Sequence, residues 1–166
     1  MSKSLLILCL GNEIISDDGF GPKVAEKLQE HPEITDIADV IFAPVAGFGL
    51  LDYFAHREKI LIVDTIRTGK VAPGTLSTYP ANIFTPSFHL TTSHQINLPT
   101  ALELGKQLGI DMPKEIDVVT VEAEDLETLC EKLTPNVEQA ISGAIELIKN
   151  WVIKNSMEEM NRERRI

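Results

Sequence analysis

The sequence predicts an α/β fold: a three-layer sandwich in which a twisted, mostly parallel sheet of about five strands carries helices on both faces. Short aliphatic runs such as Leu5–Leu10 recur along the chain, as in strands that are buried on both sides. Segments with helical spacing alternate with these runs, which is the pattern of right-handed crossovers between parallel strands. The length of 166 residues suits one domain, so we expect a single unit over residues 1–166.

Hydrophobic periodicity places the individual elements. Strands are expected at residues 5–10, 38–43, 59–64, 75–79 and 115–121. The polar strand at 75–79 should lie at an edge or in a hairpin. Helices are expected after Gly21-Pro22, over residues 49–57, in a stretch that follows His94 and ends near Gly109, and from Pro135 onward, with Thr134 as its N-cap. The charged residues 154–166 are expected to form a frayed tail.

Charge and composition exclude several classes of partner. The formal net charge is −10, and we find no Lys/Arg-rich run, so nucleic acid and anionic membrane surfaces are not expected as partners. The apolar run Leu5–Leu10 is too short to span a bilayer and lacks the pattern of a signal peptide. We therefore expect a cytoplasmic protein, and a monomer.

The two cysteines, Cys9 and Cys130, are far apart and lack the spacing of a disulfide framework or zinc finger. Cys9 lies within an apolar strand, where a thiol usually serves as a small buried hydrophobe. We expect a structural role for it.

The loop between the first strand and the first helix, residues 11–21, is the most informative segment. Parallel sheets bind ligands beyond the carboxyl ends of their strands, where this loop lies. Its glycines permit a tight backbone path, but Glu13, Asp17 and Asp18 would repel a phosphate group. Carboxylates in this position favour a cation.

Asp64 ends the aliphatic strand predicted at residues 59–64. A buried carboxylate is costly unless it meets water, a hydrogen-bond donor or a metal, so this position indicates function. The alternative is that Asp64 caps the turn at residues 65–69.

His94 lies in a polar loop, Thr91-Thr92-Ser93-His94-Gln95, on the same predicted rim as Asp18 and Asp64. Two carboxylates and one imidazole would form a site suited to a divalent ion such as nickel or zinc. Two alternatives stay open: Asp17 in place of Asp18, and His89 in place of His94. The two other histidines, His31 and His56, lie near helix ends, where exposure or a contact with the helix dipole accounts for them.

The loop residues Gly11-Asn12, Asp17-Asp18-Gly19 and Gly21 resemble the G-N-x-x-x-x-D-[DE]-G-x-G signature of the hydrogenase maturation protease family. Further segments match in the family's order over residues 5–150: Ala46-Gly47, Leu50-Leu51, Ile62-Val63-Asp64, Ala72-Pro73-Gly74-Thr75, Ser93-His94-Gln95 and Leu133-Thr134-Pro135. One departure is Cys9, where the usual G-x-G-N opening has glycine.

The resemblance implies a twisted, mainly parallel sheet and an endopeptidase activity. Its metal-binding positions fall on Asp18, Asp64 and His94, which would also be the catalytic residues. The implied partner is a hydrogenase large-subunit precursor already loaded with nickel, from which the enzyme removes the C-terminal extension after the final cysteine motif. The nickel would come with the precursor, and no organic cofactor is implied.

Several alternatives remain at this point. Hydrolysis could use a metal-activated water or a carboxylate as general base, since the sequence contains neither H-E-x-x-H nor G-x-S-x-G. A nickel-binding chaperone that docks on the precursor without cutting it would need the same ligands. A receiver-like phosphoacceptor domain, with Asp64 as acceptor beside magnesium, is the other alternative class.

Overall fold

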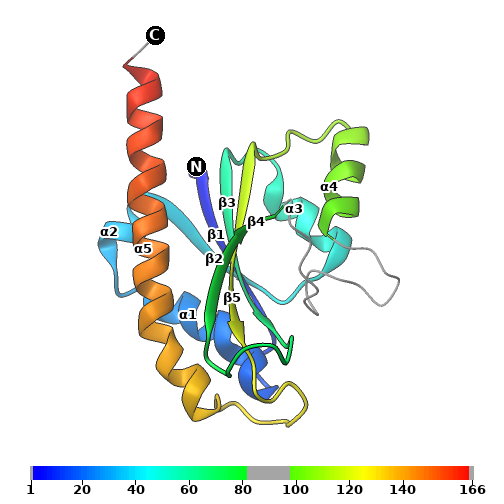
Figure 1. The fold of residues 1–166 in the computed structure, drawn as a ribbon. Coiled ribbons are helices and arrows are strands. Elements are labelled where there is room, and N and C mark those ends of the chain that lie inside the picture. The colour runs from blue at the N-terminus through cyan, green and yellow to red at the C-terminus, as the bar shows by residue number, and fades with distance from the viewer. Residues whose placement is uncertain (1, 82–97, 165–166) are drawn as a thin grey trace.

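The computed structural model describes residues 2–81 and 98–164. Its centre is a five-stranded sheet with the order β2-β1-β3-β5-β4 (Figure 1). The strands are β1 (Leu5–Leu10), β2 (Ala38–Ala43), β3 (Lys59–Ile66), β4 (Leu76–Pro80) and β5 (Glu115–Glu122). Neighbouring strands are parallel except β4, which runs antiparallel to β5 at the sheet edge. The predicted α/β class and the edge position of the polar strand are confirmed.

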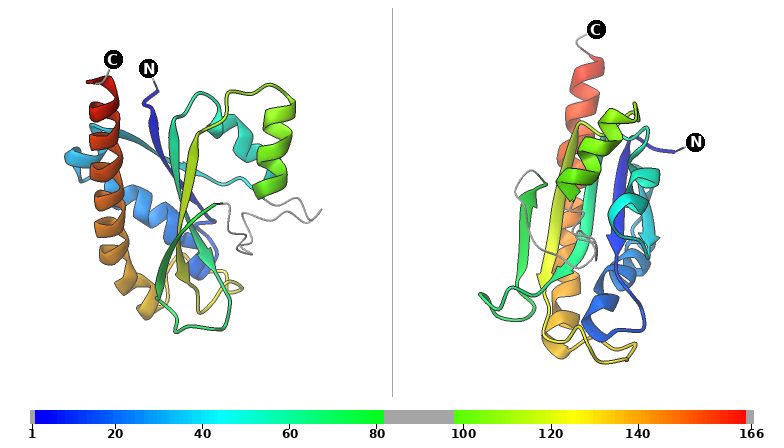
Figure 2. Two further views of the ribbon diagram at one scale, coloured as in Figure 1. Left: turned by 45° about the horizontal axis from the view of Figure 1, so that its top comes forward. Right: turned by 90° about the vertical axis from the view of Figure 1, so that its right-hand side faces the viewer.

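Helices cover both faces of the sheet (Figure 2). The helical segments are η1 (Ser16–Gly19), α1 (Phe20–Leu28), α2 (Pro32–Thr35), η2 (Gly47–Leu50), α3 (Leu51–Phe54), α4 (Leu98–Gln107) and α5 (Pro135–Glu163). Helices α1 and α5 pack on one face, while η2, α3 and α4 pack on the other. The three predicted layers are therefore present.

Strand β1 shows why the aliphatic runs are continuous. Its residues alternate between two hydrophobic clusters, with Leu5, Ile7 and Cys9 on the α1 and α5 side and their neighbours on the α3 and α4 side. Cys9 is fully buried, and this burial raises the pKa of its thiol. Its expected role as a buried hydrophobe is confirmed.

Two predicted boundaries differ from the structure. Strand β3 continues past Asp64 because Thr65 and Ile66 still pair with β5, so Asp64 lies within the strand. The helix predicted over residues 49–57 consists of the short η2 and α3, and it stops before His56, whose φ of 62° is left-handed.

The prediction of a frayed tail at residues 154–166 is wrong for its described part, since α5 continues to Glu163. The side chains of Asn155 and Glu158 both accept hydrogen bonds from Lys59 at the start of β3, at 2.7 and 2.6 Å. These tertiary contacts hold the last turns, which project beyond the sheet (Figure 1). Among the helices of residues 2–81 and 98–164, none is long and apolar enough to cross a membrane.

Candidate functional site

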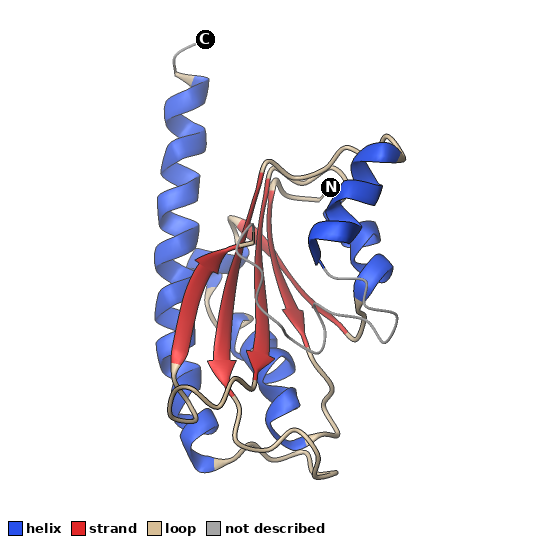
Figure 3. Cartoon of the chain, turned by 45° about the vertical axis from the view of Figure 1, so that its right-hand side comes forward, coloured by secondary structure: helices blue, strands red, loops and turns tan. Residues whose placement is uncertain are grey.

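The carboxyl ends of β1, β3 and β5 meet at one edge of the sheet, and the loops that follow these strands lie beyond it (Figure 3). This edge gathers four buried carboxylates, those of Asp17, Asp18, Asp64 and Glu122. Because buried carboxylates are costly, the hydrogen bonds of each one indicate what it does.

Two glycines explain how the β1–α1 loop returns its acidic residues to the strand. Gly11 has a φ of 149°, and a Cβ atom there would lie 2.1 Å from the carbonyl oxygen of Asp18. The neighbouring N–H of Asn12 donates to that same oxygen at 3.1 Å. At Gly21, a Cβ would lie 1.9 Å from the Leu10 carbonyl oxygen. Close backbone approach therefore requires both glycines and places η1 against the tip of β1.

The carboxylate of Asp17 ties η1 to the segment between β5 and α5. Its Oδ2 accepts hydrogen bonds from the backbone N–H groups of Glu124 and Asp125, both at 2.8 Å. Its Oδ1 accepts from the backbone N–H of Thr134 at 2.8 Å and from the Thr134 hydroxyl at 2.9 Å. Thr134 stands at the predicted N-cap position of α5, but its hydroxyl binds Asp17 and makes no capping bond to the helix.

Asp125 stabilises the same connecting segment. Its carboxylate accepts hydrogen bonds from the backbone N–H groups of Glu127 at 2.9 Å and Thr128 at 3.0 Å. A hydrogen bond from the side chain of Thr128 and these two backbone bonds lower the pKa of Asp125 to about 2. Asp125 in the turn that contacts Asp17 is therefore negatively charged at neutral pH.

Asp18 and Asp64 come from different elements, η1 and β3, and both contact Thr65. The backbone N–H of Thr65 donates to Asp64 Oδ1 at 2.8 Å, and the Thr65 hydroxyl donates to Asp18 Oδ1 at 3.1 Å. The exposed fractions of Asp18, Asp64 and Thr65 are 5%, 0% and 2%. Two of the three predicted site residues, Asp18 and Asp64, thus both contact Thr65.

Glu122, the last residue of β5, holds the turn that follows β3. Its carboxylate accepts hydrogen bonds from the backbone N–H groups of Thr68 at 2.7 Å and Gly69 at 2.8 Å, and from the Thr68 hydroxyl at 3.0 Å. Glu122 therefore caps the Thr68–Gly69 part of the turn, while Asp64 accepts the backbone N–H of Thr65 at its start. An acidic residue directly after an apolar strand was the available sequence signal for Glu122.

The contacts of Thr65 were likewise not predicted from the sequence. A hydroxyl residue beside Asp64 was a signal, but its contact with Asp18 spans 47 positions of the chain. Such a contact depends on how β1 and β3 pair, which local patterns do not specify.

The four histidines fall into two groups. His94 and His89, the predicted ligand and its alternative, lie outside the described residues. His31 lies 3.1 Å from Glu33, and His56 lies 3.4 Å from Asp111 on the exposed surface. Within residues 2–81 and 98–164, no three His, Cys, Asp or Glu residues form a group that could hold a metal ion.

Comparisons with known proteins agree with this architecture. The sequence matches the family described as "Hydrogenase maturation protease" (HycI) over residues 22–151. It is 30% identical over 164 residues to the hydrogenase 2 maturation protease of Escherichia coli K12, covering 96% of each chain. It is also 29% identical over 154 residues to the coenzyme F420 hydrogenase subunit delta of Methanothermobacter thermautotrophicus, covering 87% of this chain and 91% of that protein.

Solved structures give the same result. The hydrogenase maturating endopeptidase HybD from E. coli superposes with a TM-score of 0.76 at 29% identity, covering 93% of this chain and 94% of that one. The chain therefore belongs to the hydrogenase maturation protease family and is a peptidase of hydrogenase maturation.

Proposed function

We propose that this protein removes the C-terminal extension of a nickel-loaded hydrogenase large-subunit precursor, and that Asp18, Asp64 and His94 engage the precursor's nickel. The observation that carries the proposal is the pair of buried carboxylates, Asp18 and Asp64, that meet at Thr65 on the carboxyl end of the sheet. Ligands of open parallel sheets bind at this end.

The hydrogen bonds of the neighbouring carboxylates support the choice of Asp18 over Asp17. All four donors that reach Asp17 belong to the backbone or hydroxyl groups of Glu124, Asp125 and Thr134, so its oxygens serve the loop structure. A metal ion at Asp17 would have to displace these bonds. Asp18 shares Thr65 as a contact with Asp64, since the Thr65 hydroxyl donates to Asp18 and the Thr65 backbone N–H donates to Asp64.

Carboxylate oxygens and an imidazole nitrogen are suitable donors for nickel. In this proposal the nickel is part of the substrate, and Asp18 and Asp64 are held ready for it by Thr65. Binding a cation offsets the cost of keeping two carboxylates buried at one place. A precursor without nickel lacks this favourable binding energy. The protein would therefore recognise the metal and select the precursor that is ready for cleavage in one step.

Two routes to hydrolysis fit these residues. The carboxylates can hold the nickel beside the scissile peptide, where it polarises the carbonyl or activates a water molecule. Alternatively, Asp18 or Asp64 takes a proton from the attacking water as a general base. Both routes place the two aspartates within reach of the reacting atoms.

Intact-mass analysis tests the proposal. A nickel-loaded precursor and a metal-free precursor are incubated with substoichiometric amounts of the protein. We expect loss of a C-terminal peptide from the loaded sample alone, with several turnovers for each enzyme molecule. Protection of the extension at stoichiometric binding would instead support a nickel-sensing chaperone, and cleavage of both precursors would contradict metal checking.

We further propose that the protein acts in the cytoplasm as a monomer. The net charge of −10 disfavours close approach of two copies and of anionic lipid. Size-exclusion chromatography with light scattering should give a mass near 18.4 kDa. A mass of twice that value would contradict the monomer.

A further inference from the structure

We infer that Thr65 is a positioning residue that holds Asp18 and Asp64 in the arrangement needed to engage the metal. This inference rests on the proposed function of the two aspartates. Thr65 contacts each carboxylate through a different group: its backbone N–H reaches Asp64 at 2.8 Å and its hydroxyl reaches Asp18 at 3.1 Å.

Thr65 itself is held rigidly. It lies in β3 opposite Val121 of β5, and only 2% of its surface is exposed. A β-branched side chain in a strand has few accessible χ1 rotamers, so few directions are open to the hydroxyl. The sheet therefore supplies a fixed reference point from which the hydroxyl reaches the carboxylate of Asp18.

Asp18 needs such a reference because it belongs to a short 3-10 helix rather than to the sheet. The backbone around it is held by the N–H of Asn12, which bonds the Asp18 carbonyl at 3.1 Å. That bond places the main chain and does not act on the carboxylate. The hydroxyl of Thr65 acts on the carboxylate itself, and misplacement of a reacting group by about 1 Å can lower a rate about 100-fold.

The two contacts of Thr65 can be separated experimentally. Thr65→Val retains the backbone N–H for Asp64 and the branched shape, but it removes the donor to Asp18. Thr65→Ser retains both donors. Thr65→Ala removes the hydroxyl without adding a methyl group, so it serves if the valine variant does not fold. Thr35→Val in α2 is the matched control, since the Thr35 hydroxyl bonds only locally, to the carbonyl of His31 at 3.4 Å.

The test is single-turnover cleavage of nickel-loaded precursor by the full chain, with folding checked by thermal unfolding. We expect Thr65→Val and Thr65→Ala to lower the rate at saturating precursor about 10- to 100-fold, with less than about threefold change in the half-saturating concentration. Thr65→Ser should stay within about threefold of the wild-type protein, and Thr35→Val should match it.

Three results separate the possibilities. Wild-type rates in folded Thr65→Val or Thr65→Ala would overturn the positioning role. A Thr65→Ser protein as slow as Thr65→Val would also overturn it, because the hydroxyl would then not be the agent. Failure of the wild-type protein itself to cut loaded precursor would instead overturn the proposed function.

Discussion

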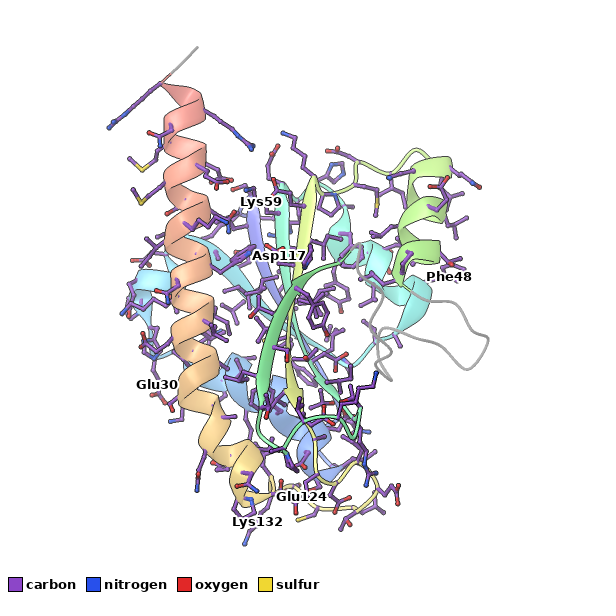
Figure 4. The ribbon with its side chains drawn as sticks, in the orientation of Figure 1. Glu30, Phe48, Lys59, Asp117, Glu124 and Lys132 are labelled. Carbon is purple, nitrogen blue, oxygen red and sulfur yellow. The ribbon has the colours of Figure 1, made fainter. Side chains whose placement is uncertain are left out.

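Strand β3 carries a buried charge near each end, and the two charges are treated differently. At the amino end, Lys59 is 2% exposed and meets Glu158 at 2.6 Å and Glu115 at 3.2 Å, so opposite charges neutralise each other within the chain. At the carboxyl end, Asp64 and Asp18 bring two carboxylates to the same threonine. Figure 4 shows Lys59 at one end of the sheet and Glu124, a backbone partner of Asp17, at the other.

This difference indicates that the Lys59 end of the sheet stabilises the fold, whereas we propose that the Asp18 and Asp64 end serves cleavage. The amino end is a closed network, since Asn155 also accepts from Lys59 at 2.7 Å and donates to the Trp151 carbonyl at 2.8 Å. Such a network fixes α5 on the sheet. Two buried carboxylates at the carboxyl end are costly to fold, and in our proposal a bound cation offsets that cost. We therefore expect changes to Lys59 to alter stability and changes to Asp18 and Asp64 to alter cleavage.

The largest expected effect is on cleavage by Asp64→Asn or Asp18→Asn. The amide keeps the shape of the side chain but removes the negative charge that we propose engages the nickel. We expect the single-turnover rate to fall about 100-fold or more, because a metal contributes several kcal/mol to such a transition state. Asp52→Asn, at an exposed position of α3, is the matched control and should cleave normally. Full activity in both site variants would remove the distinction between the two ends.

Asp17→Asn should mainly destabilise the fold. The amide nitrogen would face donors of the kind that now bind the carboxylate, so the hydrogen bonds to one of its two oxygens are lost. We expect the free energy of unfolding in urea to fall by about 3 kcal/mol. Asp18→Asn should lower it by less than about 1 kcal/mol. Equal losses in the two variants would show that the adjacent aspartates do not differ in role.

At the opposite end, Lys59→Met should reduce stability moderately and spare cleavage. The Asn155 side-chain oxygen loses its 2.7 Å bond, while the methionine fills the apolar part of the space. We expect urea unfolding to report a loss of about 1–2 kcal/mol. Cleavage by the folded variant should remain within about twofold of wild type, and a much slower variant would contradict the structural role of this end.

The smallest expected effect is a pH dependence of the contribution that Lys59 makes to the stability of the fold. Burial lowers its pKa, but hydrogen bonds to Glu158 and Glu115 outweigh burial, and the net pKa lies above 10.5. The contribution to stability is therefore complete below pH 10.5 and is lost as the pH rises through the folded-state pKa.

The contribution of Glu158 to stability depends on pH in the opposite direction. The hydrogen bond from Lys59 lowers its pKa below 4.5, so its contribution is present above pH 4.5 and is lost as the pH falls through the lowered value. The stability difference between wild type and Lys59→Met, from urea unfolding at each pH, should be constant between these limits and shrink outside them. A difference that varied between pH 6 and 9 would contradict this assignment.

Much of the fold follows from local patterns. The run at Leu5–Leu10 identified a strand buried on both faces, and the rule that ligands bind at carboxyl ends placed Asp18 and Asp64 on one rim. Both inferences depend only on residue type, spacing and chain order. They hold because every strand in the parallel part of the sheet points the same way.

The remaining features depend on partners distant in sequence. Helix α5 extends past Lys154 because Glu158 binds Lys59, which lies 99 positions earlier. Asp17 and Asp18 are chemically alike and adjacent, and the distant donors Glu124, Asp125 and Thr134 assign the first to the loop structure. Local propensity contains no information on such contacts.

X-ray absorption at the nickel K-edge tests the central claim most directly. Nickel-loaded precursor would be mixed with an equal amount of enzyme and frozen before cleavage is complete. We predict that the nickel spectrum shows additional oxygen or nitrogen ligands when wild-type protein is present. With the Asp18→Asn/Asp64→Asn double variant, the spectrum should stay closer to the spectrum of the precursor alone. An identical nickel spectrum with and without wild-type protein would contradict a direct role of these carboxylates in engaging the metal.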